Sequence, residues 1–270
     1  MVLLNKISEN YSLSSLRILV TNDDGIHAPG LKILTKIART LSNDVWTVAP
    51  EQEQSGAGHS LTLSKPLRIR KLANRRYSVD GTPTDCVLLA VKKILPRKKP
   101  TLILSGVNFG GNIGEDATYS GTVAAAMEGI LLNIPSIALS QVVTRTETPK
   151  WSTALHFAPS IIKQLLETGW PQHILININF PDLITSSVKG VRVVSQGFRP
   201  AGVDQISENL DPRERVYYWI GPQADLKEFP SNTDLEAISQ GYVSITPMDV
   251  NFTHKKTLPI LQTAFEKFKL

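Results

Sequence analysis

The sequence predicts an α/β fold with a largely parallel sheet that is covered by helices on both faces. Short apolar runs typical of strands alternate with helical segments over the first two-thirds of the 270 residues. The clearest unit is RILVTNDDGIHAPGL, residues 17–31, in which a strand ends at an acidic loop and Pro29 begins a helix. Ligands of such folds bind beyond the carboxyl ends of the strands, so the loops at those ends are candidate sites.

The composition is that of an ordinary globular protein, with 41% hydrophobic and 20% charged residues and a formal charge of +5. The basic residues gather mainly in residues 65–76 and 92–99. These clusters lack interleaved aromatic residues, so we interpret them as solvated faces that could also attract an anionic small substrate. We expect no stable nucleic-acid complex.

Cys86 is the single cysteine, so neither an intrachain disulfide nor a thiolate metal cluster can form. This fits a reducing compartment, and we expect a cytoplasmic protein with Cys86 in its core. No run approaches the roughly 18 apolar residues of a membrane span. Residues 1–16 are expected to be an N-terminal extension and not a signal peptide.

The elements follow in order along the chain. After the first strand, the helix from Pro29 has one apolar face, and a second strand ends at Pro50. Residues 61–72 alternate loosely, which suggests an antiparallel strand or hairpin arm. Thr82 or Thr84 is a plausible cap for the helix that holds Cys86. Further strands are predicted at residues 77–79, 101–104, 136–140, 174–178 and 191–194, and further helices at residues 120–127 and 152–168.

The composition changes after residue 196. Residues 197–235 are rich in Pro, Gly, Asp and Glu and contain one clear strand, residues 216–220. Residues 241–247 alternate as a strand, and residues 258–268 are predicted to form a terminal helix. The predicted organisation is therefore an extension (1–16), a catalytic core (17–196) and a C-terminal extension (197–270) that packs on the core and on a partner subunit.

Unusual polar side chains follow three of the predicted strands. They are Asp23 and Asp24 after the first strand, Ser55 after the second, and Asn108 in a glycine-rich loop after residues 101–104. The carboxyl ends of parallel strands share one edge of the sheet, so these side chains can converge. Carboxylate, hydroxyl and amide oxygens suit Mg²⁺, Mn²⁺ or Ca²⁺. The alternative is a solvated acidic turn with glycines that only serve tight turns.

A second candidate feature is the helix start at Ser120, Gly121 and Thr122. Free backbone N–H groups and hydroxyls can hold an anion there, and the helix dipole assists. A cation beside such a cradle suits phosphoester hydrolysis. Alternatively, Ser120 is only a helix cap.

Histidines add a further question about acid–base chemistry. His27 and His59 lie in the candidate loops and are either general acid–base groups or solvated, structural residues. No role is assigned to the other histidines, His156, His173 and His254.

Five segments together resemble the SurE family, stationary-phase survival proteins that are metal-dependent nucleoside monophosphate phosphatases. The segments are ILVTNDDGIHAPGL, VAPEQEQSGAGHSLTL, GTPTDCV, LILSGVNFGGNIGEDATYSGTVAAAMEG and, more weakly, GYVSITP. They span residues 17–247 in order. The resemblance implies a three-layer α/β/α, Rossmann-like core with a C-terminal arm or hairpin used in homodimers or homotetramers.

The resemblance also implies site residues. Asp23, Asp24, Ser55 and Asn108 are expected to bind one divalent cation per subunit, and Asp23 and Asp24 are the expected catalytic residues. The substrate phosphate is expected near that cation, among residues that the matching loops supply: Gly56, Asn112, Ser120, Gly121 and Thr122.

Three features depart from the family pattern. About sixteen residues precede the first strand, whereas family members commonly begin almost at it. Phe109, Gly110 and Gly111 stand where variable small residues are expected, which affects the shape of the substrate pocket. His59 stands where Asn is common, so no catalytic role is transferred to it.

The leading hypothesis is a phosphomonoesterase acting on nucleoside 5′- and 3′-monophosphates, with activity on short polyphosphate as an extension. Asp23 would orient or deprotonate the attacking water. An aspartyl-phosphate mechanism is a second reading, but its D-x-D spacing differs from the adjacent pair here, whose side chains point to opposite sides of an extended backbone. A non-catalytic nucleotide-binding module is a third, although no G-x-G-x-x-G follows the first strand and no G-x-x-x-x-G-K-[ST] occurs. A basic RNA-binding protein is the fourth.

Overall fold

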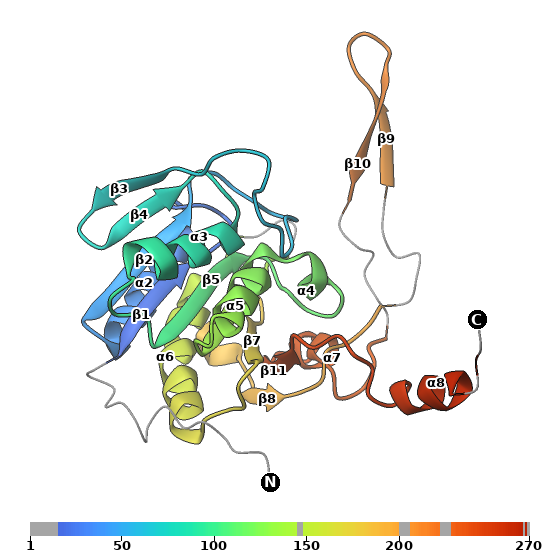
Figure 1. The fold of residues 1–270 in the computed structure, drawn as a ribbon. Coiled ribbons are helices and arrows are strands. Elements are labelled where there is room, and N and C mark those ends of the chain that lie inside the picture. Colours follow the sequence, from blue (N-terminus) through green and yellow to red (C-terminus); the bar gives the residue numbers. More distant parts are fainter. Residues whose placement is uncertain (1–15, 145–147, 200–205, 222–227, 267, 269–270) are drawn as a thin grey trace.

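The structure is a computed structural model that describes residues 16–144, 148–199, 206–221, 228–266 and 268 (Figure 1). A nine-stranded sheet forms its centre, in the order β3-β4-β2-β1-β5-β6-β7-β11-β8. The strands of this sheet are β1 (Arg17–Thr21), β2 (Asp44–Pro50), β3 (Ile69–Ala73), β4 (Arg76–Val79), β5 (Leu102–Phe109), β6 (Ser136–Gln141), β7 (Ile174–Phe180), β8 (Val191–Val193) and β11 (Val243–Asp249).

The sheet is mostly parallel, as predicted. All neighbouring pairs from β4 through β2, β1, β5 and β6 to β7 are parallel. Antiparallel pairing occurs between β3 and β4 and between β7 and β11. The carboxyl ends of β1, β2 and β5 therefore lie side by side at one edge of the sheet, because β1 pairs with both of the others.

Helices cover both faces of the sheet and complete three layers (Figure 1). Strand β1 shows the principle: Ile18 and Val20 pack in one core with α2 and α6, and Leu19 packs in the opposite core with α3 and α5. Each fully buried aliphatic side chain contributes roughly 1.5–3 kcal/mol through its removal from water. The helices are α2 (Pro29–Leu41), α3 (Pro83–Leu89), α4 (Asp116–Tyr119), α5 (Gly121–Leu131), α6 (Trp151–Thr168), α7 (Asp234–Ser239) and α8 (Leu258–Phe265).

Local capping defines two of these helices where the sequence predicts them. Thr82 caps α3: its hydroxyl accepts a hydrogen bond from the backbone N–H of Asp85, whose carboxylate accepts one from the N–H of Thr82. A π-helical turn, Ala90–Ile94, continues α3. Cys86 is fully buried with a free thiol, which confirms its place in the core. Ser120 caps α5 by accepting from the N–H of Val123.

Two predicted boundaries differ markedly from the structure. Within residues 61–72, only the end becomes a strand, β3, and it pairs antiparallel with β4. Strand β5 runs on to Phe109 instead of ending at residue 104, through an irregular register at Gly106. A Cβ atom at Gly106, whose φ is +129°, would lie 2.1 Å from the carbonyl oxygen of Leu139, so only glycine lets the strand continue there.

The segment after residue 196 has two structural roles. Strands β9 (Ile206–Leu210) and β10 (Val216–Ile220) form a separate antiparallel hairpin that projects from the main body (Figure 1). Only β10 was predicted as a strand, since β9 is partly polar in sequence. Strand β11, in contrast, lies within the central sheet between β7 and β8. Part of the predicted extension thus completes the core sheet, while the division at residue 196 stays a prediction.

The ends of the chain are only partly described. The predicted N-terminal extension lies outside the described residues except for Leu16, which is buried at 1% exposure in the core. Helix α8 ends at Phe265, three residues earlier than predicted. None of the described helices combines the length and the hydrophobicity that a membrane crossing requires.

Candidate functional site

The candidate site lies at the carboxyl ends of β1, β2 and β5. Asp23 and Asp24 follow β1, and the loop with Ser55 follows β2. Asn108 is the second-to-last residue of β5. The loop after β2 is tied directly to the acidic pair, because the N–H of Gln54 donates to the carbonyl oxygen of Asp23 at 2.8 Å. The three strand ends therefore do meet at one edge of the sheet.

Asp23 is held from the side of α5. It is 3% exposed, and its Oδ1 accepts a short hydrogen bond from the hydroxyl of Thr122. Helix α5 begins against this carboxylate, since a Cβ atom at Gly121 would lie 2.8 Å from the Cβ of Asp23. The hydroxyl oxygen of Ser120 accepts a hydrogen bond from the N–H of Val123. The start of α5 thus orients Asp23, and the N-terminal end of the helix dipole favours its negative charge.

Asp24 is half-buried and is held from the side of β5. Its Oδ2 accepts a hydrogen bond from the backbone N–H of Phe109 at 3.3 Å. Asp23 and Asp24 are therefore held by two different elements, Asp23 by α5 and Asp24 by β5.

The electrostatics of this pair are those of carboxylates without a compensating cation. Burial raises the pKa of Asp23 above its ordinary value, against hydrogen bonds from Thr122 that lower it. Burial, and then the charge of Asp23, raise the pKa of Asp24 to about 7. Glu53 raises both pKa values further, and no cationic side chain of the described residues contributes to either shift. A bound cation would offset this repulsion and desolvation.

Ser55 and Asn108 present free oxygen lone pairs. The hydroxyl of Ser55 donates to Oε1 of Glu53 at 2.8 Å, and the side-chain N–H of Asn108 donates to the carbonyl oxygen of Gly110 at 3.0 Å. The Ser55 hydroxyl hydrogen and one of the two Asn108 amide hydrogens are therefore engaged, while the Ser55 hydroxyl oxygen and the Asn108 amide oxygen keep acceptor capacity. This chemistry fits a hard divalent cation. The described residues contain no cluster of three or more His, Cys, Asp or Glu side chains suited to a metal, so any such site depends on these neutral donors.

The loop that carries Ser55 is fastened at its far end to α4 and α5. The N–H of Gly58 donates to the carbonyl oxygen of Tyr119 at 3.0 Å, and Nε2 of His59 lies 3.2 Å from Oε2 of Glu128, a buried residue of α5. His59 therefore has a structural partner, as expected under the hypothesis that it is a structural residue. His27 is exposed.

The residues predicted for phosphate binding are only partly brought together. Ser120, Gly121 and Thr122 lie beside Asp23. The hydroxyl of Thr122 already donates a hydrogen bond to that carboxylate. Gly56 is an exposed residue of the Ser55 loop with a φ of +75°.

Asn112 lies in a different, buried polar network. Its backbone N–H donates to Oδ1 of Asn179 and its side-chain N–H to the hydroxyl of Ser140, both at 2.8 Å. Its amide nitrogen is therefore engaged at the ends of β6 and β7, and its phosphate role stays a prediction.

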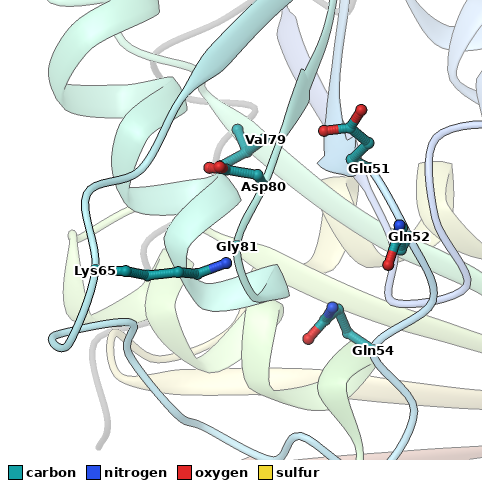
Figure 2. A pocket seen from close by; sticks show the side chains of 7 residues that line it. All are labelled: Glu51, Gln52, Gln54, Lys65, Val79, Asp80 and Gly81. Atoms are coloured by element: carbon teal, nitrogen blue, oxygen red, sulfur yellow. The ribbon is translucent and has the colours of Figure 1, made fainter.

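A small polar pocket of about 190 Å³ lies between the loop after β2 and the turn after β4 (Figure 2). Its walls come from the loop after β2, from Lys65 and from the turn between β4 and α3. Figure 2 shows the Lys65 side chain extending toward Gly81 and Gln54. This pocket contains none of the predicted site residues.

Sequence reasoning missed Glu53 and Glu128, which hold Ser55 and His59. Glu53 is two residues from Ser55, but nothing in the polar string EQEQS distinguishes it. Glu128 is 69 residues from its partner, and a single glutamate in an otherwise apolar helix was the one available signal.

The fold and the site define the class of protein. This is a three-layer α/β protein of the Rossmann-like class with a site of oxygen donors at the carboxyl ends of adjacent parallel strands. The family model "Survival protein SurE" matches residues 18–202. The chain belongs to the SurE family, as the sequence motifs implied.

Similar proteins agree with this assignment over nearly the whole chain. A relative from Paramagnetospirillum magneticum named 5′-nucleotidase SurE is 56% identical over 252 residues, which cover 93% of this chain and 96% of the relative. One with the same name from Caulobacter vibrioides is 52% identical over 92% of this chain and 95% of its own. The crystal structure of the SurE protein from Aquifex aeolicus is 39% identical, with a TM-score of 0.81, and covers 92% of this chain and 99% of that one.

Proposed function

We propose that the chain is a 5′-nucleotidase that hydrolyses nucleoside 5′-monophosphates to nucleoside and phosphate with the help of one divalent cation. The observation that carries the proposal is the desolvated pair Asp23 and Asp24 beside the start of α5. The relatives named 5′-nucleotidase, up to 56% identical, support the reaction class. Nucleoside 3′-monophosphates and short polyphosphate are proposed as further substrates of the same site.

The proposed cation ligands are Asp23, Asp24, Ser55 and Asn108. Two carboxylates would neutralise a divalent charge, and the two neutral oxygens would complete the protein's share of its coordination. A bound Mg²⁺ or Mn²⁺ supplies positive charge that polarises a phosphoryl oxygen. The raised pKa values of the two carboxyls support this assignment, because they mark negative charge that burial disfavours.

The remaining chemistry is assigned to the chain itself. The first backbone N–H groups of α5 would bind the phosphate beside Asp23, helped by the helix dipole. Asp23 would orient or deprotonate the attacking water. Thr122 would keep the Asp23 carboxylate in position for that task through its hydroxyl.

The proposed quaternary structure is a homodimer or homotetramer joined through the β9–β10 hairpin. Every residue of both strands is exposed, including Tyr217, Tyr218 and Trp219. Apolar aromatic surface on both faces of an isolated hairpin is costly in water, and burial against another subunit would remove it. The cytoplasm stays the proposed location, from the single cysteine.

The test is phosphate release from a panel of nucleoside 5′- and 3′-monophosphates, first after treatment with EDTA and then with Mg²⁺ or Mn²⁺ restored. We expect release only with the restored cation. Asp24→Asn is expected to lower kcat/KM at least 100-fold, because it removes a charged ligand of the cation. Asp249→Asn is the matched control, since Asp249 is exposed and pairs with the first residue of β7, at the opposite edge of the sheet.

Three results would overturn the proposal. Phosphate release that is unaffected by EDTA would show that hydrolysis needs no divalent cation. Equal activity of Asp24→Asn and the native chain would show that the active site does not lie at the end of β1. Tight nucleotide binding without release in any divalent cation would favour a binding module.

A further inference from the structure

An apolar cavity opens directly beside Asp24. Its volume is about 560 Å³, within the usual range for small-molecule sites. The walls that matter are Phe109 from the end of β5, Trp151 at the start of α6, and the backbone and rings of Pro29 and Pro149. The cavity therefore borders the acidic pair on the side of Asp24, away from the start of α5.

Two aromatic rings shape this cavity. The centroids of Phe109 and Trp151 lie 6.5 Å apart with their planes inclined at 55°. Phe109 is 57% exposed at the mouth of this cavity, so much of its ring is open to a ligand. The rings thus offer uncovered faces within the same recess as Asp24.

Hydrogen bonds anchor the backbone that carries Phe109. The N–H of Phe109 donates to Asp24, and the next N–H, that of Gly110, donates to the carbonyl oxygen of Gln141 at 2.9 Å. Trp151 is fixed by the first turn of α6 and by close approach to Gly30, where a Cβ atom would lie 3.2 Å from its ring. An aromatic side chain has only two torsion angles, so such rings on an anchored backbone lose little entropy when they bind a flat ligand.

We propose that this cavity binds the base of the nucleotide, with the flat base stacked against Phe109 and Trp151. The inference rests on the proposed function, because it needs the phosphate at the start of α5 and the acidic pair. With the phosphate bound there, the sugar would lie beside Asp24 and the base would enter the cavity. A purine or pyrimidine fits these walls, since every base has a π-face that stacks on aromatic rings whatever its hydrogen-bonding edge.

The polar edge of the cavity is supplied by Glu53 and Thr148. Glu53 accepts a hydrogen bond from the hydroxyl of Ser55, so the same loop contributes to the proposed cation site and to the rim of the cavity. The two sites are therefore contiguous, and substrates with a base gain contacts that a bare sugar phosphate lacks.

The test separates base binding from hydrolysis. Calorimetry measures the binding of adenosine to the EDTA-treated protein, which requires no turnover. Kinetics then compare AMP with ribose 5-phosphate, which carries the same phosphate and sugar without a base. We expect Phe109→Ala to weaken adenosine binding about tenfold and to raise the KM ratio of AMP to ribose 5-phosphate by a similar factor, the size typical of one lost stacking contact.

Four further variants make the result specific. Trp151→Phe keeps a ring at the start of α6 and is expected to weaken adenosine binding less than Trp151→Ala. Phe252→Ala is the matched control, because Phe252 is 87% exposed and does not line the cavity. Lys65→Ala tests the polar pocket of Figure 2 as a rival location for the base.

Each outcome decides the proposal. Loss of adenosine binding in Lys65→Ala with full binding in Phe109→Ala would overturn it in favour of the polar pocket. An unchanged KM ratio in Phe109→Ala and Trp151→Ala would also overturn it. If adenosine binds through Phe109 but no phosphate is released from any ester, the base site stands and the proposed hydrolysis fails.

Discussion

Gly121 lies so close to Asp23 that a side chain cannot be added between them. A Cβ atom on Gly121 would come within 2.8 Å of the Asp23 Cβ and 3.0 Å of its Oδ2. The first turn of α5 therefore approaches the carboxylate as closely as a bare backbone allows. This contact links the helix start to the end of β1, and it makes the position of Asp23 sensitive to a single methyl group.

Gly121→Ala is expected to displace Asp23 and to lower the affinity for Mn²⁺ at least tenfold, because overpacking of this kind costs about 1–3 kcal/mol unless the neighbours move. Calorimetric titration with Mn²⁺ measures the effect. Gly129→Ala is the matched control in the same helix: its Cβ would clash with the hydroxyl of Ser136, at 2.1 Å, and not with Asp23. Equal Mn²⁺ affinity in the two variants would contradict the prediction.

Thr122→Val keeps the shape of the side chain but removes the hydroxyl that donates to Asp23. A buried carboxylate oxygen then loses its donor, so the free energy of unfolding should fall by about 1–3 kcal/mol and the pKa of Asp23 should rise further. Urea unfolding at pH 7 measures the stability. Thr122→Ser retains the hydroxyl and should recover most of the loss; a Ser variant as unstable as Val would point to packing instead.

Asp44 gives the fold a pH-dependent stability far from the candidate site. Burial alone would raise its pKa, but hydrogen bonds from Arg17 and Trp46 and the charges of Arg17 and Arg75 hold the pKa below its ordinary value of 3.8. The Arg17 and Arg75 contacts measure 2.7 and 3.2 Å. A carboxyl whose pKa is lowered by folding stabilises above its unfolded pKa, and this stabilisation is lost as the pH falls through the folded pKa.

Asp44→Asn should therefore lower the free energy of unfolding by about 1–2 kcal/mol at pH 7, less than a fully buried hydrogen bond to a charged partner because solvent screens this partly exposed group. The difference from the native chain should shrink progressively below pH 4. Chemical denaturation between pH 3 and pH 7 tests this. A difference that stays constant over that range would show that the charge of Asp44 is not the cause.

The hairpin can be tested through mass in solution. Tyr217 and Trp219 share one face of β10, because successive side chains alternate across a strand. Replacing both with Lys puts two charges on the proposed interface and should shift the particle from a dimer or tetramer toward the monomer, as measured by light scattering after gel filtration. Nucleotide hydrolysis measured at the same time shows whether the site depends on assembly. If the native chain is already monomeric, the proposed subunit interface does not exist.

Much of the fold was predictable from sequence because its signals are local. The apolar run before Asp23 and Asp24, Pro29 at the start of α2, and the capping residues Thr82 and Ser120 each act within a few residues of the chain. The parallel direction of the strands then followed from their alternation with helices, and the shared edge of the three strand ends followed from that direction.

The sequence by itself thus determined the class of fold, the acidic strand end and the helix start beside it. The tertiary structure decided which partners those residues have: Phe109 for Asp24, Glu128 for His59, and β7 for β11. It also brought Phe109 and Trp151 together, 42 positions apart in the chain, as walls of one cavity. The physical reason is that such contacts depend on how layers pack across the sheet, and periodicity and capping carry no information about contacts so distant in sequence.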